Sequence, residues 1–245
     1  MSTSQHTFPT RLGRFQNANE FIQAWLDYNS NNPLIAKAGL TAFIADVLAA
    51  NGAVDTAAIP VNNARTERNP LVFKLKDTNP LCLEARYQAI GNYLNGEFKP
   101  ISSSAKSVRA ILKKINPKYK KIETPPGEEP KKRRSTAEAS FTAMVGHGNT
   151  IIAIITALGV AYNPPDNNLK VPQMQALVDQ VNELNKLIAK KLEPLGTAEK
   201  ARLKLYDGED GMDDRIRLIK SYLGSFSPPK KHPHYIEFSQ AIKGV

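Results

Sequence analysis

An internal repeat constrains the fold of this chain more than any other feature of its sequence. A Tyr-Asn pair followed by turn-forming residues occurs twice, as YNSNNPL from Tyr28 and as YNPPDNNL from Tyr162. When the sequence is aligned with itself at a shift of 134, so that residue 28 falls on residue 162, further similar residues align without a gap. These aligned residues recur at helical spacing. The superposed pairs are Leu40 with Met174, Phe43 with Leu177, Ile44 with Val178, Val47 with Val181, Asn51 with Asn185, Val54 with Ile188, Pro60 with Pro194, Ala64 with Ala198, Arg68 with Arg202 and Leu71 with Leu205. This pattern indicates that one helical unit is written twice.

The match resumes after a shorter loop in the second copy, where position 86 falls on position 215 and the shift becomes 129. The further pairs are Arg86 with Arg215, Ile90 with Ile219, Tyr93 with Tyr222, Leu94 with Leu223 and Phe98 with Phe226. The sequence therefore predicts a tandem duplication of a unit of roughly 110 residues. We expect copy 1 at residues 1–116, a linker at 117–138 and copy 2 at 139–245.

Each copy is predicted to be all-α, because no stretch shows the sustained alternation of a strand. A first helix is expected at 18–27, with an apolar face formed by Phe21, Ile22, Trp25 and Leu26. A long amphipathic helix follows the Tyr-Asn turn, and its internal proline, Pro60 or Pro194, is expected to kink it or to start a new helix. A shorter helix and a last one, at 104–115 or 235–242, complete about four helices per copy, as in an up-and-down bundle. The two copies are expected to pack either as pseudo-twofold lobes or as one continuous bundle.

The linker carries a disproportionate share of the positive charge. The chain has a net charge of +10, of which residues 1–116 hold +5, residues 117–138 hold +3 and residues 139–245 hold +2. The basic residues of the linker are Lys118, Lys120, Lys121, Lys131, Lys132, Arg133 and Arg134. They form either an exposed, solvated linker or a set of contacts to an anion such as nucleic-acid phosphate.

Candidate catalytic and metal-binding residues are few. His232 and His234 lie two apart in a proline-rich loop, without a nearby third ligand, and His147 between two glycines is expected to break a helix. The acidic stretch DGEDGMDD lacks the glutamate that an EF-hand requires, so we expect a solvated loop before a helix. Cys82 is expected to be a buried thiol. The sequence therefore predicts no catalytic set, no metal and no cofactor.

The positions that recur in both copies are expected to belong to the scaffold. For the arginines, a repeated contact to an anion or partner is the alternative to pairing with carboxylates or helix carbonyls inside each unit. We expect the tyrosines of the two turns to anchor those turns on the core. The recurring positions are Tyr28, Asn29, Pro60, Arg68, Arg86 and Tyr93 in copy 1, and Tyr162, Asn163, Pro194, Arg202, Arg215 and Tyr222 in copy 2.

Cellular location is predicted from the N-terminus, the apolar runs and the single cysteine. The first residues contain no apolar signal-peptide core, and the most apolar stretch, residues 151–160, is too short to span a bilayer. One cysteine excludes an intramolecular disulfide. We expect a cytoplasmic protein without a membrane span, with non-classical export as the alternative.

Copy 2 resembles a family of uncharacterised bacterial helical-bundle proteins. In these proteins a Tyr-Asn-Pro turn, a long helix, a Pro-Leu segment followed by Ala-Arg, and a terminal Tyr-to-Phe-Ser-Pro segment occur in that order. The matching residues here are Tyr162-Asn163-Pro164, Pro194-Leu195, Ala201-Arg202 and Tyr222-Leu223 to Phe226-Ser227-Pro228. The resemblance covers most of copy 2 and copy 1 more loosely. It implies a helical fold and no particular activity.

Three functional hypotheses follow from this sequence. The first is a non-enzymatic structural or interaction protein that self-assembles or bridges protein partners, since a duplicated scaffold offers two similar surfaces. The second is nucleic-acid binding through the basic first half and the linker. The third is an enzyme, which would require a polar cleft built from residues far apart in the sequence. No small-molecule substrate is predicted.

Overall fold

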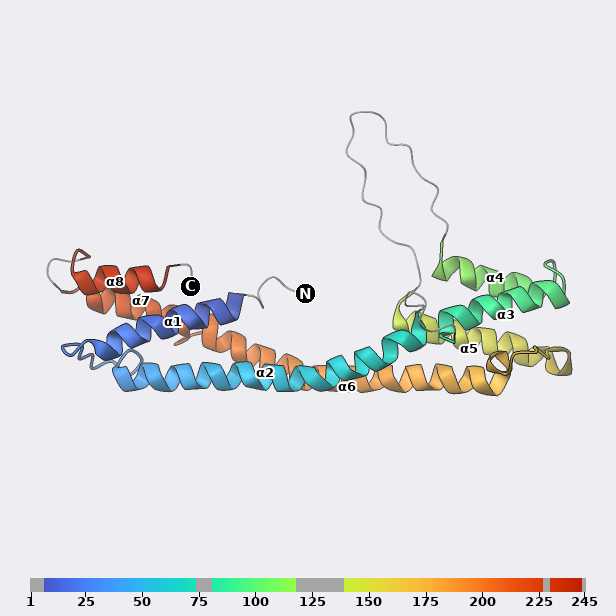
Figure 1. Ribbon diagram of the computed structural model, residues 1–245, viewed down its shortest axis with the longest axis horizontal. Helices are drawn as coiled ribbons and strands as arrows, with labels where there is room; N and C mark the ends of the chain where they lie inside the picture. The colour runs from blue at the N-terminus through green and yellow to red at the C-terminus, as the bar shows by residue number, and fades with distance from the viewer. Residues whose placement is uncertain (1–6, 74–80, 118–138, 227–229, 244–245) are drawn as a thin grey trace, which may run out of the picture. The chain divides into compact units, whose positions relative to one another are not determined.

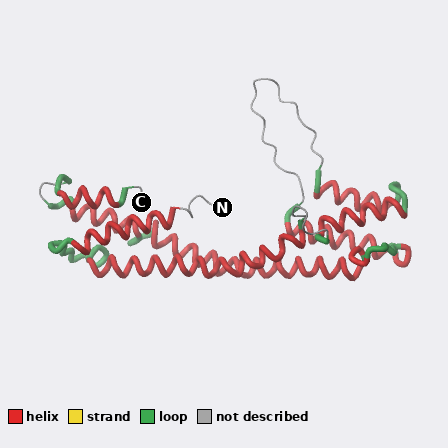
Figure 2. The backbone as a smooth tube through the Cα atoms, viewed as in Figure 1, coloured by secondary structure: helices red, strands yellow, loops and turns green. Residues whose placement is uncertain are grey.

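A computed structural model describes residues 7–73, 81–117, 139–226 and 230–243 of the chain. Across these ranges every regular element is a helix, as the uniform red of the regular elements in Figure 2 shows. The prediction of an all-α fold is confirmed.

The chain divides into two compact units, and each unit combines parts of both predicted copies. Unit 1 consists of Met1–Ile59 and Lys191–Val245, and unit 2 consists of Pro60–Lys190. The division predicted from the sequence runs along the chain, at the linker 117–138. The observed division instead falls inside the two longest helices, α2 (Lys37–Val72) and α6 (Val171–Asp207).

Unit 1 packs elements from the two ends of the chain around one core. Blue α1 (Thr7–Ala24) lies beside red α8 (Pro233–Ala241), which also contacts α7 (Met212–Leu223) (Figure 1). The first part of α2 and the last part of α6 complete the unit. The core residues are Phe8, Leu12, Phe15, Ala18, Ile22, Tyr28, Ile35, Leu40, Phe43, Val47, Tyr206, Met212, Ile216, Ile219, Leu223, Phe238 and Ile242.

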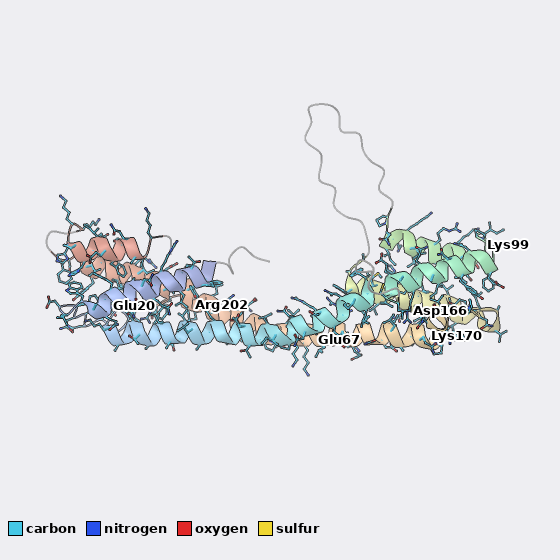
Figure 3. The ribbon with its side chains drawn as sticks, viewed as in Figure 1. Glu20, Glu67, Lys99, Asp166, Lys170 and Arg202 are labelled. Atoms are coloured by element: carbon cyan, nitrogen blue, oxygen red, sulfur yellow. The ribbon has the colours of Figure 1, made fainter. Side chains whose placement is uncertain are left out.

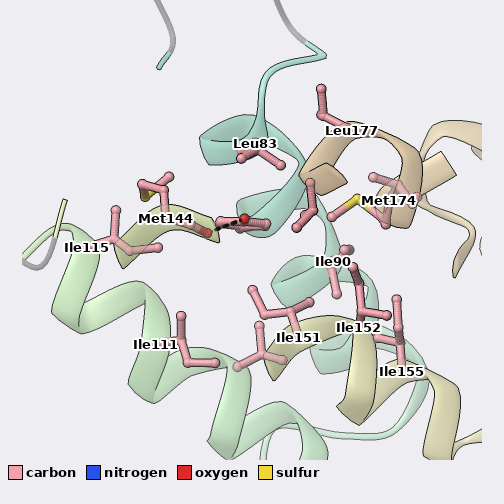
Figure 4. Close-up of a cluster of buried hydrophobic side chains, with 14 of the residues drawn as sticks. Leu83, Ile90, Ile111, Ile115, Met144, Ile151, Ile152, Ile155, Met174 and Leu177 are labelled. Carbon is pink, nitrogen blue, oxygen red and sulfur yellow. Dashed lines mark hydrogen bonds between the residues drawn. The ribbon is translucent and has the colours of Figure 1, made fainter. Parts of the chain in front are cut away.

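Unit 2 has its own core, built from the middle of the chain. Its elements are the last part of α2, α3 (Leu83–Glu97), α4 (Ser103–Ile115), α5 (Phe141–Ala157), two short 3-10 turns, η1 (Gly159–Ala161) and η2 (Asn167–Leu169), and the first part of α6. Figure 4 shows aliphatic side chains of α3, α4, α5 and α6 meeting in this core. The dashed line there is the hydrogen bond, 2.7 Å long, that the Tyr87 hydroxyl donates to the Met144 carbonyl.

The helix starts show why these segments begin where they do. Ser102 and Ser140 are N-caps, each accepting a hydrogen bond from the backbone N–H three residues on, at 3.3 Å and 3.2 Å.

The acidic stretch predicted to precede a helix does so, since α7 begins at Met212 with two aspartates in its first turn. Arg11 of α1 binds two acids of this stretch, Asp207 at 2.6 Å and Asp213 at 2.7 Å. These ion pairs outweigh the effect of burial and raise the pKa of Arg11.

The long helices run through their internal prolines. The predicted buried face of α6, from Met174 to Ile188, is buried, which confirms the periodicity argument. The alternative that Pro60 or Pro194 starts a new helix is wrong, because both residues lie inside continuous helices. Each proline removes one backbone donor without ending the helix.

The first helix differs from its predicted range of 18–27. It begins at Thr7 because Phe8, Leu12 and Phe15 are all buried, on the same face as Ile22. It ends at Ala24, so Leu26, predicted to lie on the apolar face, is 92% exposed.

The segment around His147 was predicted to break a helix, and this prediction is wrong. Gly146, His147 and Gly148 all lie inside α5, which continues to Ala157. Gly148 is required there for packing, because a Cβ atom at this position would meet the Tyr87 hydroxyl and lie 2.6 Å from Val178 Cγ2. A Cβ atom at Gly146 would meet nothing within 4 Å.

The two glycines of α5 should therefore respond in opposite directions to alanine. We expect Gly148→Ala to lower the free energy of unfolding by about 1–3 kcal/mol, because the added methyl group overpacks the core against Tyr87 and Val178. Gly146→Ala should raise it by up to about 1 kcal/mol, because alanine is the better helix former and the site is open. Urea unfolding followed by circular dichroism measures both. Equal effects from the two variants would contradict the packing described for α5.

Candidate functional site

A network of hydrogen bonds and ring contacts in unit 1 surrounds the turn that begins at Tyr28. The Tyr28 hydroxyl is buried and donates to the Ile35 carbonyl at 2.8 Å. The Tyr28 ring packs edge-on against Tyr222 of α7, with centroids 5.1 Å apart, and the Tyr222 hydroxyl donates to the Asn29 carbonyl at 3.0 Å. Arg215 of α7 donates to the carbonyls of Leu34 and Asp210, the latter at 3.0 Å. We call this arrangement turn site 1.

Unit 2 contains a matching arrangement around Tyr162, which we call turn site 2. The Tyr162 hydroxyl donates to the Leu169 carbonyl at 2.9 Å, and its ring packs edge-on against Tyr93 of α3 with centroids 5.4 Å apart. The backbone N–H of Asn163 donates to the Tyr93 hydroxyl at 3.3 Å. Arg86 of α3 donates to the carbonyls of Asn168 at 2.9 Å and Leu81 at 2.7 Å. The turn tyrosines therefore anchor both turns on a core, as expected from the sequence.

The electrostatics of the two turn sites suit a structural role. Burial, reinforced by the neighbouring Tyr222 or Tyr93, raises the pKa of Tyr28 and of Tyr162. Burial also lowers the pKa of Arg86 and of Arg215, although nearby carboxylates partly oppose it. Each guanidinium donates its hydrogen bonds to backbone carbonyls: Arg86 to those of Leu81 and Asn168, and Arg215 to those of Leu34 and Asp210. The sequence-based interpretation of these arginines as scaffold residues named two kinds of partner, carboxylates and backbone carbonyls. Backbone carbonyls are the partners found here.

The other recurring arginines, Arg68 and Arg202, each lie over an aromatic ring near the start of a helix, α5 for Arg68 and α1 for Arg202. The Arg68 guanidinium carbon is 3.3 Å from the Phe141 ring centroid, and Arg68 also donates to the Asn185 side-chain oxygen at 3.0 Å. The Arg202 guanidinium carbon is 4.4 Å from the Phe8 ring centroid. Arg202 is labelled in Figure 3 on the last part of α6. Both arginines thus form cation–π contacts inside their own units.

The basic linker residues Lys118, Lys120, Lys121, Lys131, Lys132, Arg133 and Arg134 lie outside the described residues. The structure does describe a basic helix just before them. In α4, Lys106 and Lys113 are exposed, while Arg109 donates to the Asn95 side-chain oxygen at 2.8 Å. The structure thus places basic side chains on a defined helical face next to the linker in the sequence.

A polar pocket of about 470 Å³ lies in unit 1 beside Arg215. Its lining includes the acids Asp46, Glu209 and Asp210, the base Lys204 and the Phe43 ring. Arg215 lies over this ring with its guanidinium carbon 4.2 Å from the centroid. The pocket lining combines both signs of charge with an aromatic ring, a mixture that suits a small polar ligand.

An aromatic cluster that the sequence did not predict joins the end of α1 to the start of α8. Trp25 packs on His234 and Phe226, with centroids 4.1 Å and 5.3 Å away, and His232 lies 5.5 Å from Phe226. His232 occupies the N-cap position of α8, and His234 follows in its first turn. The two histidines thus pack against rings.

Among the described residues, no group of three His, Cys, Asp or Glu could hold a metal. Cys82 is buried, as expected.

The chain matches no protein-family model, no curated protein and no solved structure. The resemblance to a bacterial helical-bundle family therefore stays a prediction.

Among the described residues, one helix, α2, is long and apolar enough to cross a membrane by length and composition alone. This is weak evidence, since core helices of soluble proteins meet the same requirement.

Alkaline unfolding should report the burial of the turn tyrosines. Burial raises the pKa of Tyr28, Tyr87 and Tyr162 above the value of about 10 that tyrosine has in an unfolded chain. Their stabilising contribution is fully present below pH 10 and falls as the pH rises toward their folded pKa values, because the unfolded state alone loses the proton. We expect each tyrosine to reduce the free energy of unfolding by about 1.4 kcal/mol per pH unit in that range.

Denaturant unfolding from about pH 9 to about pH 12, with phenolate absorbance recorded in parallel, measures this effect. Tyr162→Phe serves as the matched variant. It should cost about 1 kcal/mol at neutral pH, through the lost hydrogen bond to Leu169, and show a shallower alkaline decline. Ionisation of all the tyrosines while the protein stays folded would contradict the burial of these hydroxyls.

Proposed function

We propose that this protein is a non-enzymatic structural or interaction protein, a duplicated helical module that self-assembles or bridges protein partners. The observation that carries the proposal is an exposed apolar face on α2. Between Thr41 and Ile59 this helix exposes several alanines together with Leu48 and Ile59. Contiguous exposed apolar surface is typical of interaction sites.

The residues of this face are small and regularly spaced. No lysine or arginine occurs between Lys37 and Arg65, and Leu48 and Ile59 are 49% and 57% exposed. The exposed residues from 41 to 59 are Thr41, Ala42, Ala45, Asp46, Leu48, Ala49, Gly52, Ala53, Asp55, Thr56 and Ile59. Six of them, at positions 42, 45, 49, 52, 56 and 59, alternate in steps of three and four, the spacing of a helix–helix seam. Small side chains on such a seam let another helix approach closely.

The corresponding stretch of α6 provides an internal comparison. The shift of 134 places these positions on Gln175, Ala176, Asp179, Gln180, Asn182, Glu183, Lys186, Leu187, Ala189, Lys190 and Glu193. Most of these residues are charged or carry amides, as on an ordinary solvated helix face. The apolar face of α2 is therefore not a requirement of the helical scaffold itself, which supports an interaction role for it.

The proposed duplication is supported by the two turn sites. Each partner in turn site 1 has its counterpart in turn site 2 at the shift read from the sequence. Ile35 corresponds to Leu169, Leu34 to Asn168 and Asp210 to Leu81, in addition to the paired tyrosines and arginines. We infer that residues 1–116 and 139–245 are related copies of about four helices each.

Light scattering after size exclusion, together with electron microscopy, tests the proposed self-assembly. We expect the protein to form oligomers, or to capture protein partners, through α2. A double variant, Leu48→Glu with Ile59→Glu, should shift the distribution at least several-fold toward monomer, because it places charges on the apolar face.

The matched control is Leu187→Glu, at an exposed leucine on the charged face of α6 that is 41% exposed. It should leave the distribution unchanged. A strict monomer that also captures no partner in pull-downs would refute the proposed function.

Nucleic-acid binding remains the second candidate, and the basic face of α4 favours it. Lys106 and Lys113 are exposed on this helix, next in the sequence to the basic linker.

We expect nucleic-acid binding to weaken steeply with salt. A double variant, Lys106→Glu with Lys113→Glu, should weaken the binding about uniformly across nucleic-acid sequences. Mobility shifts over a salt series measure this, with Lys186→Glu on α6 as the control. Absence of binding at low salt would exclude this function.

A further inference from the structure

The two turn sites are built reciprocally from the two predicted copies. In turn site 1 the Tyr-Asn turn comes from copy 1, whereas the tyrosine and arginine that hold it, Tyr222 and Arg215, come from copy 2. In turn site 2 the turn comes from copy 2, and Tyr93 and Arg86 come from copy 1. Each copy therefore provides one turn and holds the turn of the other.

The same exchange extends through the rest of each unit. Arg202 and Tyr206, from copy 2, contact Phe8 of copy 1: the guanidinium lies over the ring, and the Tyr206 hydroxyl donates to the Phe8 carbonyl at 3.2 Å. In unit 2 the order is reversed, since Arg68 of copy 1 lies over Phe141 of copy 2. The Tyr87 hydroxyl of copy 1 likewise bonds the Met144 carbonyl of copy 2.

The division of the chain into units agrees with a turn held by the other copy. In copy 1 the Tyr-Asn turn before α2 belongs to unit 1, whereas α3 and α4, which follow α2, belong to unit 2. In copy 2 the turn before α6 belongs to unit 2, whereas α7 and α8 belong to unit 1.

We propose that this chain is a covalently joined, reciprocally exchanged homodimer of its repeat. The partner that the surface of each copy fits is a second copy of the same helical repeat. The contacts between residues 7–115 and residues 139–243, not the connecting segment 117–138, hold the two copies together. This inference rests on the duplication included in the proposed function, and it does not depend on whether the whole chain self-assembles.

Cleavage of the connecting segment in the intact, folded chain tests the proposal. A site-specific protease sequence would replace part of 117–138, and the purified protein would be cut without denaturant. We expect the two fragments to co-elute at the mass of the uncut chain and to keep its helical circular dichroism. The melting temperature of the cut protein should depend more steeply on concentration than that of the uncut protein, because cutting adds a bimolecular step to folding.

A matched pair of variants locates the contacts that hold the fragments together. Arg86→Ala and Arg215→Ala remove equivalent guanidinium groups from turn sites 2 and 1. Each should raise the dissociation constant of the cut fragments, by about tenfold or more, because each removes a charge-assisted hydrogen bond between the copies, from Arg86 to Asn168 or from Arg215 to Leu34. The control Lys186→Ala, at an exposed residue on α6, should not change it.

Two fragments that separate without denaturant, each keeping its helices and melting independently of concentration, would overturn the proposal, because each copy would then fold on its own. Fragments that separate and unfold would also overturn it, since the contacts between the copies would then be too weak to hold them. A cut pair that stays together while the uncut chain is a strict monomer supports the exchange and refutes self-assembly. The two proposals therefore fail separately.

Discussion

The continuity of the two long helices is the constraint on which the rest of the structure depends. Pro60 and Pro194 each remove a backbone donor, yet α2 and α6 run through them. Each helix begins in one compact unit and ends in the other, so the turn before it and the helices after it belong to different units. Each Tyr-Asn turn has its partners in the other half of the chain. The buried hydroxyls of Tyr28 and Tyr162 and the carbonyl-bonding arginines Arg215 and Arg86 provide that connection.

The proposed duplication makes it possible to separate scaffold contacts from features specific to one half of the chain. Contacts that recur in both units, such as the turn sites and the arginines over aromatic rings, are expected of any copy of this fold. Features present in one unit only are candidates for a role beyond folding. The apolar face of α2 is one, and the cluster of Trp25 with His232 and His234 is another. The first of these supports an interaction function, and the second closes α8 on the end of α1.

Periodicity predicted much of this fold, because burial on a helix repeats every three or four residues. It identified the buried face of α6 and most of that of α2. It placed the start of α1 too late, although the spacing of Phe8, Leu12 and Phe15 was a usable signal. The Trp25 cluster had no signal at all, since its members lie about two hundred positions apart and share no pattern. The pocket beside Arg215 was missed for the same reason.

The amino-acid sequence by itself determined that the chain is helical, that its pattern recurs at a regular shift and which faces of the long helices are buried. It also singled out the tyrosines and arginines of the turn sites. Only the tertiary structure decided which copy supplies each partner. Both copies carry the same tyrosine, asparagine and arginine, so pairing within a copy and pairing between copies satisfy the sequence pattern equally well. The choice between them is made by the tertiary contacts inside each unit, which pair a turn of one copy with a tyrosine and an arginine of the other.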